Sequence, residues 1–364
     1  MIKKKILIAT GGTGGHIFPA YSLVNFFEDK YHSVALTTDY RGFKYLKDYK
    51  NLNISVLPSS PLIKKNFIKI LFSILKVFYS IIRSFLFLLF NRPSIIFGMG
   101  GYSSFPICIA ASILRIKFII YENNLVLGKA NKLLLPYAKK IFVSYKELDG
   151  IPEKYKYKVF ELGNLIRKEI IDKSLKNNHI EKIGGLKILV IGGSQAAKIF
   201  ANDLPLIFNK LKNSNIEIKV FQQCQKEQNK ELSEFYGKTK IDYELFNFSN
   251  NIIKYYSKVN LVITRSGASV LAELLNFNIP FISIPLPTSA DNHQYKNAEF
   301  YSKKGYGYLL EEKDIKIKLF DLINLIYKDT SLIKKIKINQ SQYSDKDVFK
   351  KIKNQIEEII NEKN

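Results

Sequence analysis

The sequence predicts an α/β protein built from two Rossmann-like halves that face a cleft. Its 364 residues suggest two domains, at roughly 100–200 residues per domain. Two apolar strands, about half a chain apart, each lead into a glycine-rich turn and then a helix-like run. Further apolar strands alternate with helical stretches and end in polar or glycine-rich residues, which is where open α/β sheets bind ligands.

The first of the two similar openings lies at the start of the chain. Residues 6–9 form an apolar run, 10–15 are glycine-rich, and Pro19 to Phe27 has helix-like character. The apolar run is shorter than the ~7–15 residues of a signal-peptide core, so we predict a buried parallel strand and no targeting signal. Glycines let a ligand approach the backbone, and the following helix offers unpaired N–H groups to an anion.

The second opening repeats this pattern. Residues 188–191 are apolar, and the turn 192–195 contains Gly192 and Gly193. A helical run follows from Ala196 to Phe208, and we expect Asp203 and Pro205 to interrupt it. One such turn is also compatible with a plain strand-to-helix connection, whereas two of them favour two nucleotide-binding halves.

Four further strands complete the pattern. Each predicted strand and the polar or glycine-rich residues after it are 94–97 before 98–101, 118–121 before 122–124, 261–264 before 265–267, and 281–284 before 285–287. The composition of the Lys- and Asn-rich stretch Lys173–Gly185 predicts a linker between the two domains. We therefore expect domains at 1–165 and 166–345, and a terminal helix within 346–364 that packs back on the first domain.

Charge and cysteine content narrow the function classes. The net charge of +24 favours an anionic partner, either nucleic acid, an anionic membrane or a phosphorylated substrate. An AT-rich genome, which enriches Lys, Ile and Asn, explains part of this excess. The basic residues are dispersed without a nucleic-acid-reading motif, so we expect no nucleic-acid partner. Cys108 and Cys224 are too few for a disulfide framework or a cysteine zinc site and fit a reducing cytoplasm.

The segment Phe67–Phe90 is so apolar that it could contact or span a membrane. Cations interrupt it at seven-residue intervals with serines beside them, and on a helix these positions form one polar stripe. The stripe contains Lys69, Lys76, Arg83, Ser73, Ser80 and Ser84. We predict a basic amphipathic helix lying in the headgroup region of an anionic membrane. The alternatives are a domain helix buried on its apolar face and a true membrane span.

Five motifs carry a family resemblance, in the family's order and spacing across nearly the whole chain. They are Gly11–His16 with Pro19 and Ala20; Gly98–Ser103 with Pro106; Gly192–Gln195; Arg265–Ala268 with Glu273; and Pro285–Pro287 with His293, Gln294, Asn297 and Ala298. Together they resemble the motifs of the MurG family, peripheral membrane glycosyltransferases that complete the lipid-linked peptidoglycan precursor. The chain departs from the family's usual residues at Asn123, Leu165, Ala196 and Asn278, although Asn tolerates left-handed geometry.

The resemblance implies a GT-B glycosyltransferase fold and an inverting transfer. N-acetylglucosamine would move from UDP-N-acetylglucosamine to the 4-hydroxyl of undecaprenyl-diphospho-N-acetylmuramoyl-pentapeptide, in peptidoglycan and cell-wall synthesis. The resemblance places the donor mainly on the C-terminal domain and the lipid-linked acceptor on the N-terminal, membrane-facing domain. It implies a peripheral location at the cytoplasmic face of the bacterial inner membrane, where an anionic surface would be a partner.

Matching positions suggest individual roles. Glu273 would accept hydrogen bonds from the ribose hydroxyls, and an exposed helix acid is the alternative. Ser194 and the helix start would hold the diphosphate, Arg167 would bind the donor, and Ser249 would read the uracil through its backbone. The implied donor-binding residues are Thr13, Gly14, Gly15, Asn124, Arg167, Ser194, Ser249, Ala268, Ser269, Val270, Leu271, Ala272, Glu273 and Gln294.

His16 is the candidate general base. A neutral imidazole accepts a proton near pH 7, but His16 can equally act by hydrogen-bonding the loop or a phosphate. No cofactor is expected. Asp345 and Asp347 form the sequence's only Asp-x-Asp, in a segment unlike the acidic metal motif of the other main glycosyltransferase fold, so we expect metal-independent chemistry.

Two other functions remain open. Another GT-B enzyme that uses a UDP-sugar and a different lipid acceptor would share the C-terminal motifs. A non-catalytic UDP-sugar-binding or membrane scaffold protein is the second alternative. The first-domain glycine loops argue against the former, and the presence of His16, Glu273 and Gln294 in one chain argues against the latter.

Overall fold

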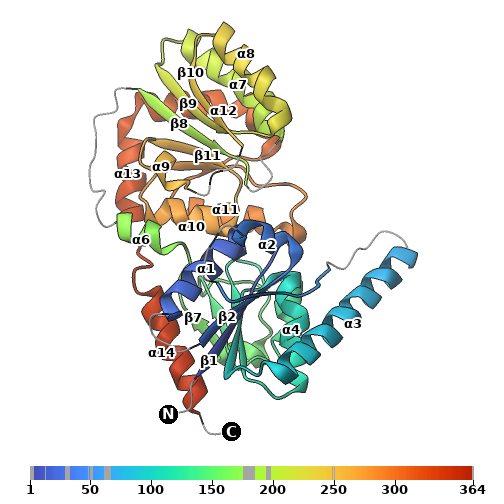
Figure 1. The fold of residues 1–364 in the computed structure, drawn as a ribbon. Coiled ribbons are helices and arrows are strands. Elements are labelled where there is room, and N and C mark those ends of the chain that lie inside the picture. The colour runs from blue at the N-terminus through green and yellow to red at the C-terminus, as the bar shows by residue number, and fades with distance from the viewer. Residues whose placement is uncertain are drawn as a thin grey trace. The chain divides into compact units, whose positions relative to one another are not determined.

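The computed structural model describes residues 4–12, 14–28, 33–47, 49, 52–60, 67–174, 185–193, 198–247, 249 and 251–362. The chain divides into two compact units. Unit 1 comprises Met1–Arg167 and Asp345–Asn364, and unit 2 comprises Lys168–Ser344. Each unit is a parallel sheet with helices packed on it (Figure 1).

The sheet of unit 1 is parallel throughout, with the order β3-β2-β1-β4-β5-β6-β7. Its strands are β1 (Lys5–Ala9), β2 (Ser33–Thr38), β3 (Ile54–Val56), β4 (Ile95–Gly98), β5 (Phe118–Glu122), β6 (Ile141–Val143) and β7 (Val159–Glu161). Residues 6–9 of β1 are buried, as a strand covered on both faces requires. The strand order reverses direction at β1 and β4, so the loops after these two strands lie at the ligand-binding edge of such sheets.

The helices of unit 1 are α1 (Gly14–Glu28), α2 (Tyr40–Leu46), α3 (Phe67–Phe90), α4 (Gly101–Ile113), α5 (Lys129–Leu134), the 3₁₀ helix η1 (Glu153–Lys158) and α14 (Val348–Asn361). α1 begins inside the glycine-rich turn, earlier than the expected start at Pro19.

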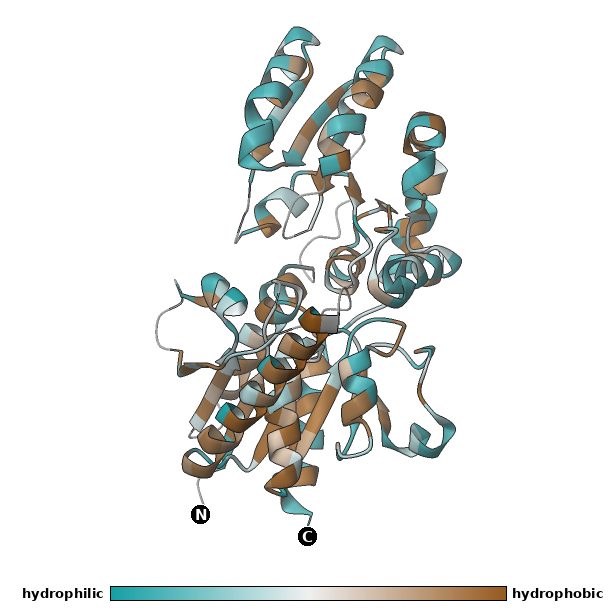
Figure 2. Ribbon diagram, turned by 90° about the vertical axis from the view of Figure 1, so that its right-hand side faces the viewer, coloured by the Kyte–Doolittle hydropathy of each residue, from teal (hydrophilic) through white to brown (hydrophobic). Residues whose placement is uncertain are grey.

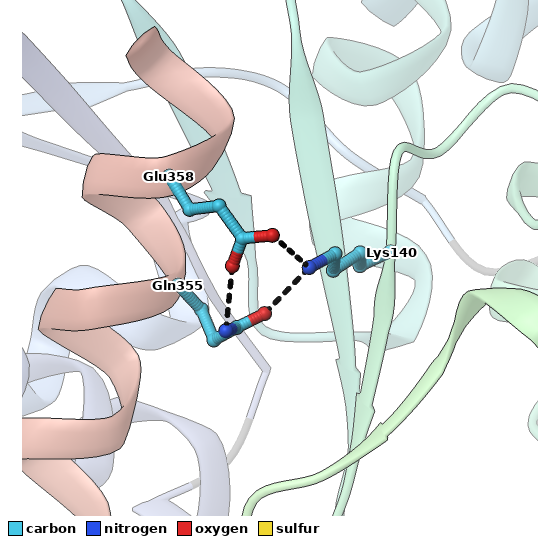
Figure 3. A network of polar contacts seen from close by, with 3 residues as sticks. All are labelled: Lys140, Gln355 and Glu358. Atoms are coloured by element: carbon cyan, nitrogen blue, oxygen red, sulfur yellow. Dashed lines mark hydrogen bonds and ion pairs between the residues drawn. The ribbon is translucent and has the colours of Figure 1, made fainter. Parts of the chain in front are cut away.

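The C-terminal helix α14 packs on unit 1. The ring centroids of Phe349 and Phe26 lie 5.2 Å apart. Lys140, the residue before β6, donates from Nζ to Gln355 Oε1 at 2.6 Å and to Glu358 Oε1 at 3.3 Å (Figure 3). Gln355 in turn donates to Glu358 Oε2 at 2.8 Å. The end of the chain therefore joins the first unit through both apolar and polar contacts.

The sheet of unit 2 is also parallel, with the order β10-β9-β8-β11-β12-β13. Its strands are β8 (Leu186–Ile191), β9 (Ile218–Gln223), β10 (Asp242–Phe246), β11 (Leu261–Thr264), β12 (Phe281–Ser283) and β13 (Tyr308–Leu309). Its helices are α6 (Lys168–Ser174), α7 (Lys198–Asn213), α8 (Asn229–Lys238), α9 (Ile253–Tyr256), α10 (Ala268–Asn276), α11 (His293–Lys303), α12 (Ile315–Lys328), α13 (Thr330–Ser341), and the 3₁₀ helices η2 (Lys226–Gln228), η3 (Ala290–Asn292) and η4 (Glu312–Asp314).

The expected interruption of the helix after the second glycine-rich turn is wrong. α7 is one helix that contains both Asp203 and Pro205. Its inner face buries Phe200, Leu204 and Phe208. Tertiary packing supplies most helix stability, so this burial offsets the hydrogen bond that Pro205 removes.

Both cysteines are buried and unpaired by disulfides. Cys108 lies on α4 against β4, where a Cβ on Gly98 would lie 3.0 Å from its Sγ. Burial raises the pKa of the Cys108 thiol to about 12. Cys224 follows β9, and burial raises its pKa as well. Both side chains therefore behave as small apolar groups of the two cores.

Candidate active site

Two glycine-rich loops of unit 1 lie side by side because they follow the adjacent parallel strands β1 and β4. A Cβ on Gly11 would lie only 2.5 Å from Ser103 Cβ, and one on Gly12 would lie 3.8 Å from the Tyr102 hydroxyl oxygen. Gly12 and Gly101 have φ values of 81° and 75°, a conformation that favours glycine. The close approach of the loops thus depends on residues that have no side chain.

Asp39, directly after β2, fixes the first loop. Its Oδ1 accepts hydrogen bonds from the backbone N–H of Gly12 at 3.0 Å and of Gly42 at 2.8 Å. Its Oδ2 accepts from Ser59 Oγ at 3.2 Å. Sequence reasoning missed Asp39, although an acid between β2 and α2 is a signal for a helix cap. The carboxylate here caps α2 and also holds the glycine loop.

His16 lies in the first turn of α1, together with Gly14 and Gly15. Its side chain is half-buried, and a Cβ on Gly101 would lie 4.0 Å from its Nε2. The ring therefore faces the second glycine loop. The backbone N–H groups of this first turn carry the positive end of the helix dipole and suit an anion. Thr13 lies outside the described residues.

Tyr102 and Arg41 border the same two loops. Arg41 Nη1 donates to the Tyr102 hydroxyl oxygen at 3.2 Å. Burial, followed by the nearby carboxylate of Asp39, raises the pKa of Tyr102. The phenol stays protonated at neutral pH and keeps its ability to donate a hydrogen bond.

Asn124 follows β5, the strand next to β4, and Glu122 fixes it. Glu122 Oε1 accepts from Asn124 N at 3.2 Å and from Asn124 Nδ2 at 3.0 Å. Glu122 Oε2 accepts from Gly128 N at 2.9 Å and from Asn131 Nδ2 at 3.0 Å. Asn124 therefore lies on a loop held by a buried carboxylate, one strand away from the paired glycine loops.

Arg167 ends the first stretch of unit 1. Its guanidinium carbon lies 5.1 Å from the ring centroid of Phe18, which is on α1. The segment before it is anchored by Asp345, which accepts from Asn164 N at 2.8 Å and from Asn164 Nδ2 at 3.1 Å. Leu165 N donates to the Tyr121 hydroxyl oxygen at 2.9 Å. Asp345 thus has a structural contact, and among the described residues no cluster of three or more His, Cys, Asp or Glu could hold a metal.

In unit 2, Gln223 joins three strand ends. Its Oε1 accepts from Gly192 N at 3.1 Å, and its Nε2 donates to the carbonyl of Asn247 at 3.1 Å. These contacts connect the loops after β8, β9 and β10. Ser194, with Gln195 and Ala196, lies outside the described residues. Ser249 is half-buried in the segment after β10.

The helix α10 follows β11 through Arg265, Ser266 and Gly267. Ala268, Leu271 and Ala272 are buried, and Ser269 and Val270 are half-buried. The first-turn amides of this helix face the carboxyl end of the sheet, as in other strand–turn–helix anion sites. Contacts within unit 2 hold the guanidinium group of Arg265 in place. Its Nη1 donates to the carbonyls of Ile284 and Pro285, and its Nη2 lies 2.5 Å from Glu312 Oε2.

Glu273 is only 6% exposed, so the alternative of an exposed helix acid is wrong. Its Oε2 accepts a hydrogen bond from the hydroxyl of Tyr256 at 3.0 Å. Tyr256 belongs to α9 and was not found from the sequence. A buried carboxylate needs such donors, because burying an ionised group without partners is costly.

Gln294 lies at the start of α11 and contacts the loop after β12. Its Oε1 accepts from Leu286 N at 2.9 Å, and its backbone N–H donates to Ser289 Oγ at 3.4 Å. On the same helix, Asn297 Nδ2 donates to the carbonyl of Ser266 at 3.1 Å. The structure therefore brings Gln294 and the α10 start to neighbouring strand ends of unit 2.

The helix α3 carries a second candidate functional surface, the one predicted to bind a membrane. It packs along α4, and its buried positions are Ser73, Ser80, Ser84 and Leu88. Its outer face is apolar, and Figure 2 shows it as a mostly brown helix facing the viewer. The large exposed side chains are Ile68, Ile70, Leu71, Phe72, Ile74, Leu75, Phe78, Tyr79, Ile82, Leu86, Leu89 and Phe90. The alternative of a helix buried on its apolar face is therefore wrong.

The expected single stripe of cations and serines is also wrong in part. The serines face the protein, where Ser73 Oγ donates to the Ile70 carbonyl at 2.8 Å and Ser80 Oγ to the Lys76 carbonyl at 2.7 Å. Lys69, Lys76 and Arg83 are exposed. By length and composition alone, the segment Ile68–Phe90 is long and apolar enough to cross a membrane. Only 17% of its most apolar 18-residue stretch is buried.

Comparison with known families gives one match in each half of the chain. Residues 6–143 match the glycosyltransferase family 28 N-terminal domain, and residues 187–357 match the family 28 C-terminal domain. A protein of Pelagibacter ubique is 38% identical, over 99% of this chain and 100% of its own length. A protein of Rickettsia felis is 35% identical, over 94% of this chain and 98% of its own. Both are named UDP-N-acetylglucosamine–N-acetylmuramyl-(pentapeptide) pyrophosphoryl-undecaprenol N-acetylglucosamine transferase.

Solved structures show the same fold. Acinetobacter baumannii MurG has a TM-score of 0.77 and 21% identity, covering 98% of this chain and 99% of its own. S. aureus MnaA in complex with UDP has a TM-score of 0.70 and 15% identity, covering 98% and 97%. With two parallel α/β units and both family matches, the predicted GT-B fold is confirmed.

Proposed function

The chain belongs to glycosyltransferase family 28 and within it to the MurG family, and from this premise we propose its reaction. The chain transfers N-acetylglucosamine from UDP-N-acetylglucosamine to the 4-hydroxyl of undecaprenyl-diphospho-N-acetylmuramoyl-pentapeptide. The observation that carries this proposal is the 38% identity to a protein of that name, which extends over both units. The product is the complete lipid-linked precursor of peptidoglycan.

Unit 2 is the donor unit in this proposal. Glu273 accepts hydrogen bonds from the ribose hydroxyls, and the start of α10 with the loop of Ser194 holds the diphosphate. Asn124 and Arg167 of unit 1 and Gln294 contribute further donor contacts, and the backbone at Ser249 reads the uracil. UDP leaves with growing negative charge, and fixed N–H dipoles stabilise that charge without reorganisation. The buried position of Glu273 and the loop anchoring by Gln223 support this assignment.

Unit 1 is the acceptor unit. The 4-hydroxyl oxygen attacks the anomeric carbon, the bond from that carbon to the UDP oxygen breaks, and inversion follows from attack opposite the leaving group. Neutral His16 takes the hydroxyl proton, while Thr13, Gly14 and Gly15 approach the phosphates. The half-buried ring of His16 beside Gly101 supports a role within the paired glycine loops.

The outer face of α3 holds unit 1 on the membrane that carries the acceptor. Among the side chains of α3 that the structure describes, twelve large apolar ones are exposed, and Lys69, Lys76 and Arg83 are exposed with them. A full-sized apolar side chain gains about 1.5–3 kcal/mol on leaving water, and cations near the headgroups add attraction to anionic lipid. Such a surface supports peripheral binding at the cytoplasmic face, where a UDP-sugar is available.

A transfer assay tests the reaction. Purified protein is incubated with labelled UDP-N-acetylglucosamine, a short-chain lipid-linked muramoyl-pentapeptide and EDTA, and Glu273→Ala serves as the impaired control. We expect label in the lipid product, which would establish the donor, the acceptor and metal-independent transfer together. Donor binding by calorimetry without any transfer would contradict the acceptor and favour a GT-B enzyme with a different lipid acceptor.

A further inference from the structure

We propose that Tyr256 is a positioning residue that sets the orientation of the Glu273 carboxylate toward the ribose of the donor. The inference rests on the proposed ribose-binding role of Glu273 and adds to it a second side chain that determines nucleotide specificity. Tyr256 itself acts through Glu273 and needs no contact with the ligand.

The contact lies inside unit 2 and is built from two packed elements. Tyr256 is 2% exposed, and its hydroxyl donates to Glu273 Oε2 at 3.0 Å. Its ring packs on Phe277, the residue after α10, with ring centroids 5.7 Å apart. Packing thus holds the phenol ring against the end of the same helix that carries Glu273, and the ring presents its hydroxyl to the carboxylate.

A single fixed donor has a large effect on a carboxylate, because the terminal torsion of Glu is broad and has no strong intrinsic preference. A hydrogen bond at Oε2 selects one rotation of the carboxylate plane. A ribose diol offers donors at two fixed positions, so its binding depends on that rotation. The phenol of Tyr256 donates as a neutral group, so this hydrogen bond does not neutralise the carboxylate of Glu273.

The chain provides a matched control one residue earlier. Tyr255 lies on the same helix, is also 2% exposed, and donates its hydroxyl to a carboxylate oxygen, Glu244 Oε1, at 3.0 Å. Glu244 belongs to β10 and has no proposed contact with the ribose. Tyr255→Phe therefore removes an equivalent tyrosine–glutamate hydrogen bond without touching Glu273.

The experiment measures the dissociation constants of UDP and 2′-deoxy-UDP by calorimetry for the full chain and its Tyr256→Phe, Tyr255→Phe and Glu273→Gln variants. The readout is the preference for UDP over 2′-deoxy-UDP, which a general loss of stability does not change. We expect Tyr256→Phe to reduce this preference by about 10-fold, the order of one hydrogen bond, and Tyr255→Phe to preserve it. Adding Tyr256→Phe to Glu273→Gln should cause no further loss, because both changes act on one interaction.

The outcomes separate this inference from the function on which it rests. If Glu273→Gln leaves the preference unchanged, the ribose role of Glu273 is wrong, and the inference is overturned with it. If Glu273→Gln abolishes the preference and Tyr256→Phe retains it, the ribose role stands and the inference alone is overturned. A lowered Tm for Tyr256→Phe with an unchanged preference would assign Tyr256 a purely structural role and also overturn the inference.

Discussion

The side chain of His16 is half-buried, and its ring lies next to the second glycine-rich loop of unit 1, at Gly101. Its Nε2 lies 4.0 Å from the place where Gly101 would carry a Cβ, which is an ordinary van der Waals distance, and it is the φ of 75° that favours glycine at position 101. A neutral imidazole can accept a proton near pH 7. The two roles left open by the sequence, base and phosphate binder, differ in which kinetic constant they control.

We therefore expect His16→Ala to lower kcat by about 10²–10⁴-fold, the usual contribution of a general base, while the Kd of UDP-N-acetylglucosamine changes little. The transfer assay gives kcat, and calorimetry on the same preparation gives the Kd. A kcat within a few-fold of the unchanged chain would contradict the base role. A loss confined to the KM of the lipid acceptor would assign His16 to phosphate binding instead.

Sequence reasoning succeeded or failed at single residues for identifiable reasons. Asn278, where glycine is common in the family, does adopt a left-handed φ of 58°, because that requirement is local to the end of α10. The contacts of Glu273, Gly192 and Asn164 were not predicted. Their partners are 17, 31 and 181 residues away in the chain, and no local pattern specifies which side chain the fold brings to them.

At the level of elements, α3 has its polarity reversed relative to an ordinary surface helix. Its serines are buried, and most of its aromatic and aliphatic side chains are exposed. Small side chains on the inner face let two helices approach closely. The hydroxyls of Ser73 and Ser80 donate to carbonyls of α3 itself, whereas Ser84 Oγ is buried without a hydrogen-bond partner among the described residues. The spacing of the polar positions could be predicted from the sequence. Which side of the helix is covered could not, because that depends on the packing partner.

The role of the outer face of α3 in membrane binding can be tested by replacing three exposed residues that contribute little to folding. Phe72, Leu75 and Phe78 are 60%, 55% and 61% exposed. Replacing all three with Ser should weaken binding to anionic vesicles by about 100-fold, at about 1 kcal/mol for each half-exposed side chain. Co-sedimentation with phosphatidylglycerol vesicles measures the binding, and the Kd for UDP should stay unchanged.

The control variant carries Ser at three exposed apolar positions of unit 2, namely Leu206, Ile317 and Leu325, which are 61%, 70% and 54% exposed. It should keep vesicle binding at the level of the unchanged chain. An equal loss in both triple variants would mean that general surface hydrophobicity, and not α3, determines the binding.

For the whole molecule, the chain passes between the two units twice, after Arg167 and before Asp345. Asp345 joins these two segments within unit 1, because it accepts two hydrogen bonds from Asn164 and is 4% exposed. Tyr121 secures the same segment through Leu165, and burial raises its pKa so that the phenol remains protonated at neutral pH. Both connections of unit 1 to the rest of the chain are therefore held by one buried polar network.

The two residues of the Asp-x-Asp sequence should accordingly differ in their effect on stability. Asp345→Ala leaves buried donors of Asn164 without their acceptor and should cost about 2–4 kcal/mol in the free energy of unfolding of unit 1. Asp347 is exposed and its side chain makes no cap hydrogen bond, so Asp347→Ala should change stability by less than about 0.5 kcal/mol. Urea unfolding followed by circular dichroism compares them. Equal midpoints would contradict the anchoring role of Asp345.

The two-unit α/β architecture could be predicted from local features of the sequence, namely apolar strands that end in glycine-rich turns and alternate with helices. Such features repeat along the chain and need no knowledge of distant contacts. The position of α14 on unit 1 depends on contacts such as Phe349 with Phe26 and Gln355 with Lys140, which are set by tertiary packing. The sequence could suggest a terminal helix, but only the structure identifies the side chains that attach it.

The buried state of both cysteines makes the chain suitable for fluorescence spectroscopy. Cys108 belongs to unit 1 and Cys224 to unit 2, and the raised pKa of both thiols keeps them unreactive toward maleimide dyes at neutral pH. A single cysteine introduced on the surface of each unit would thus be labelled on the native background. Energy transfer between the two dyes would then follow, in real time, how each unit responds when nucleotide or lipid vesicles are added.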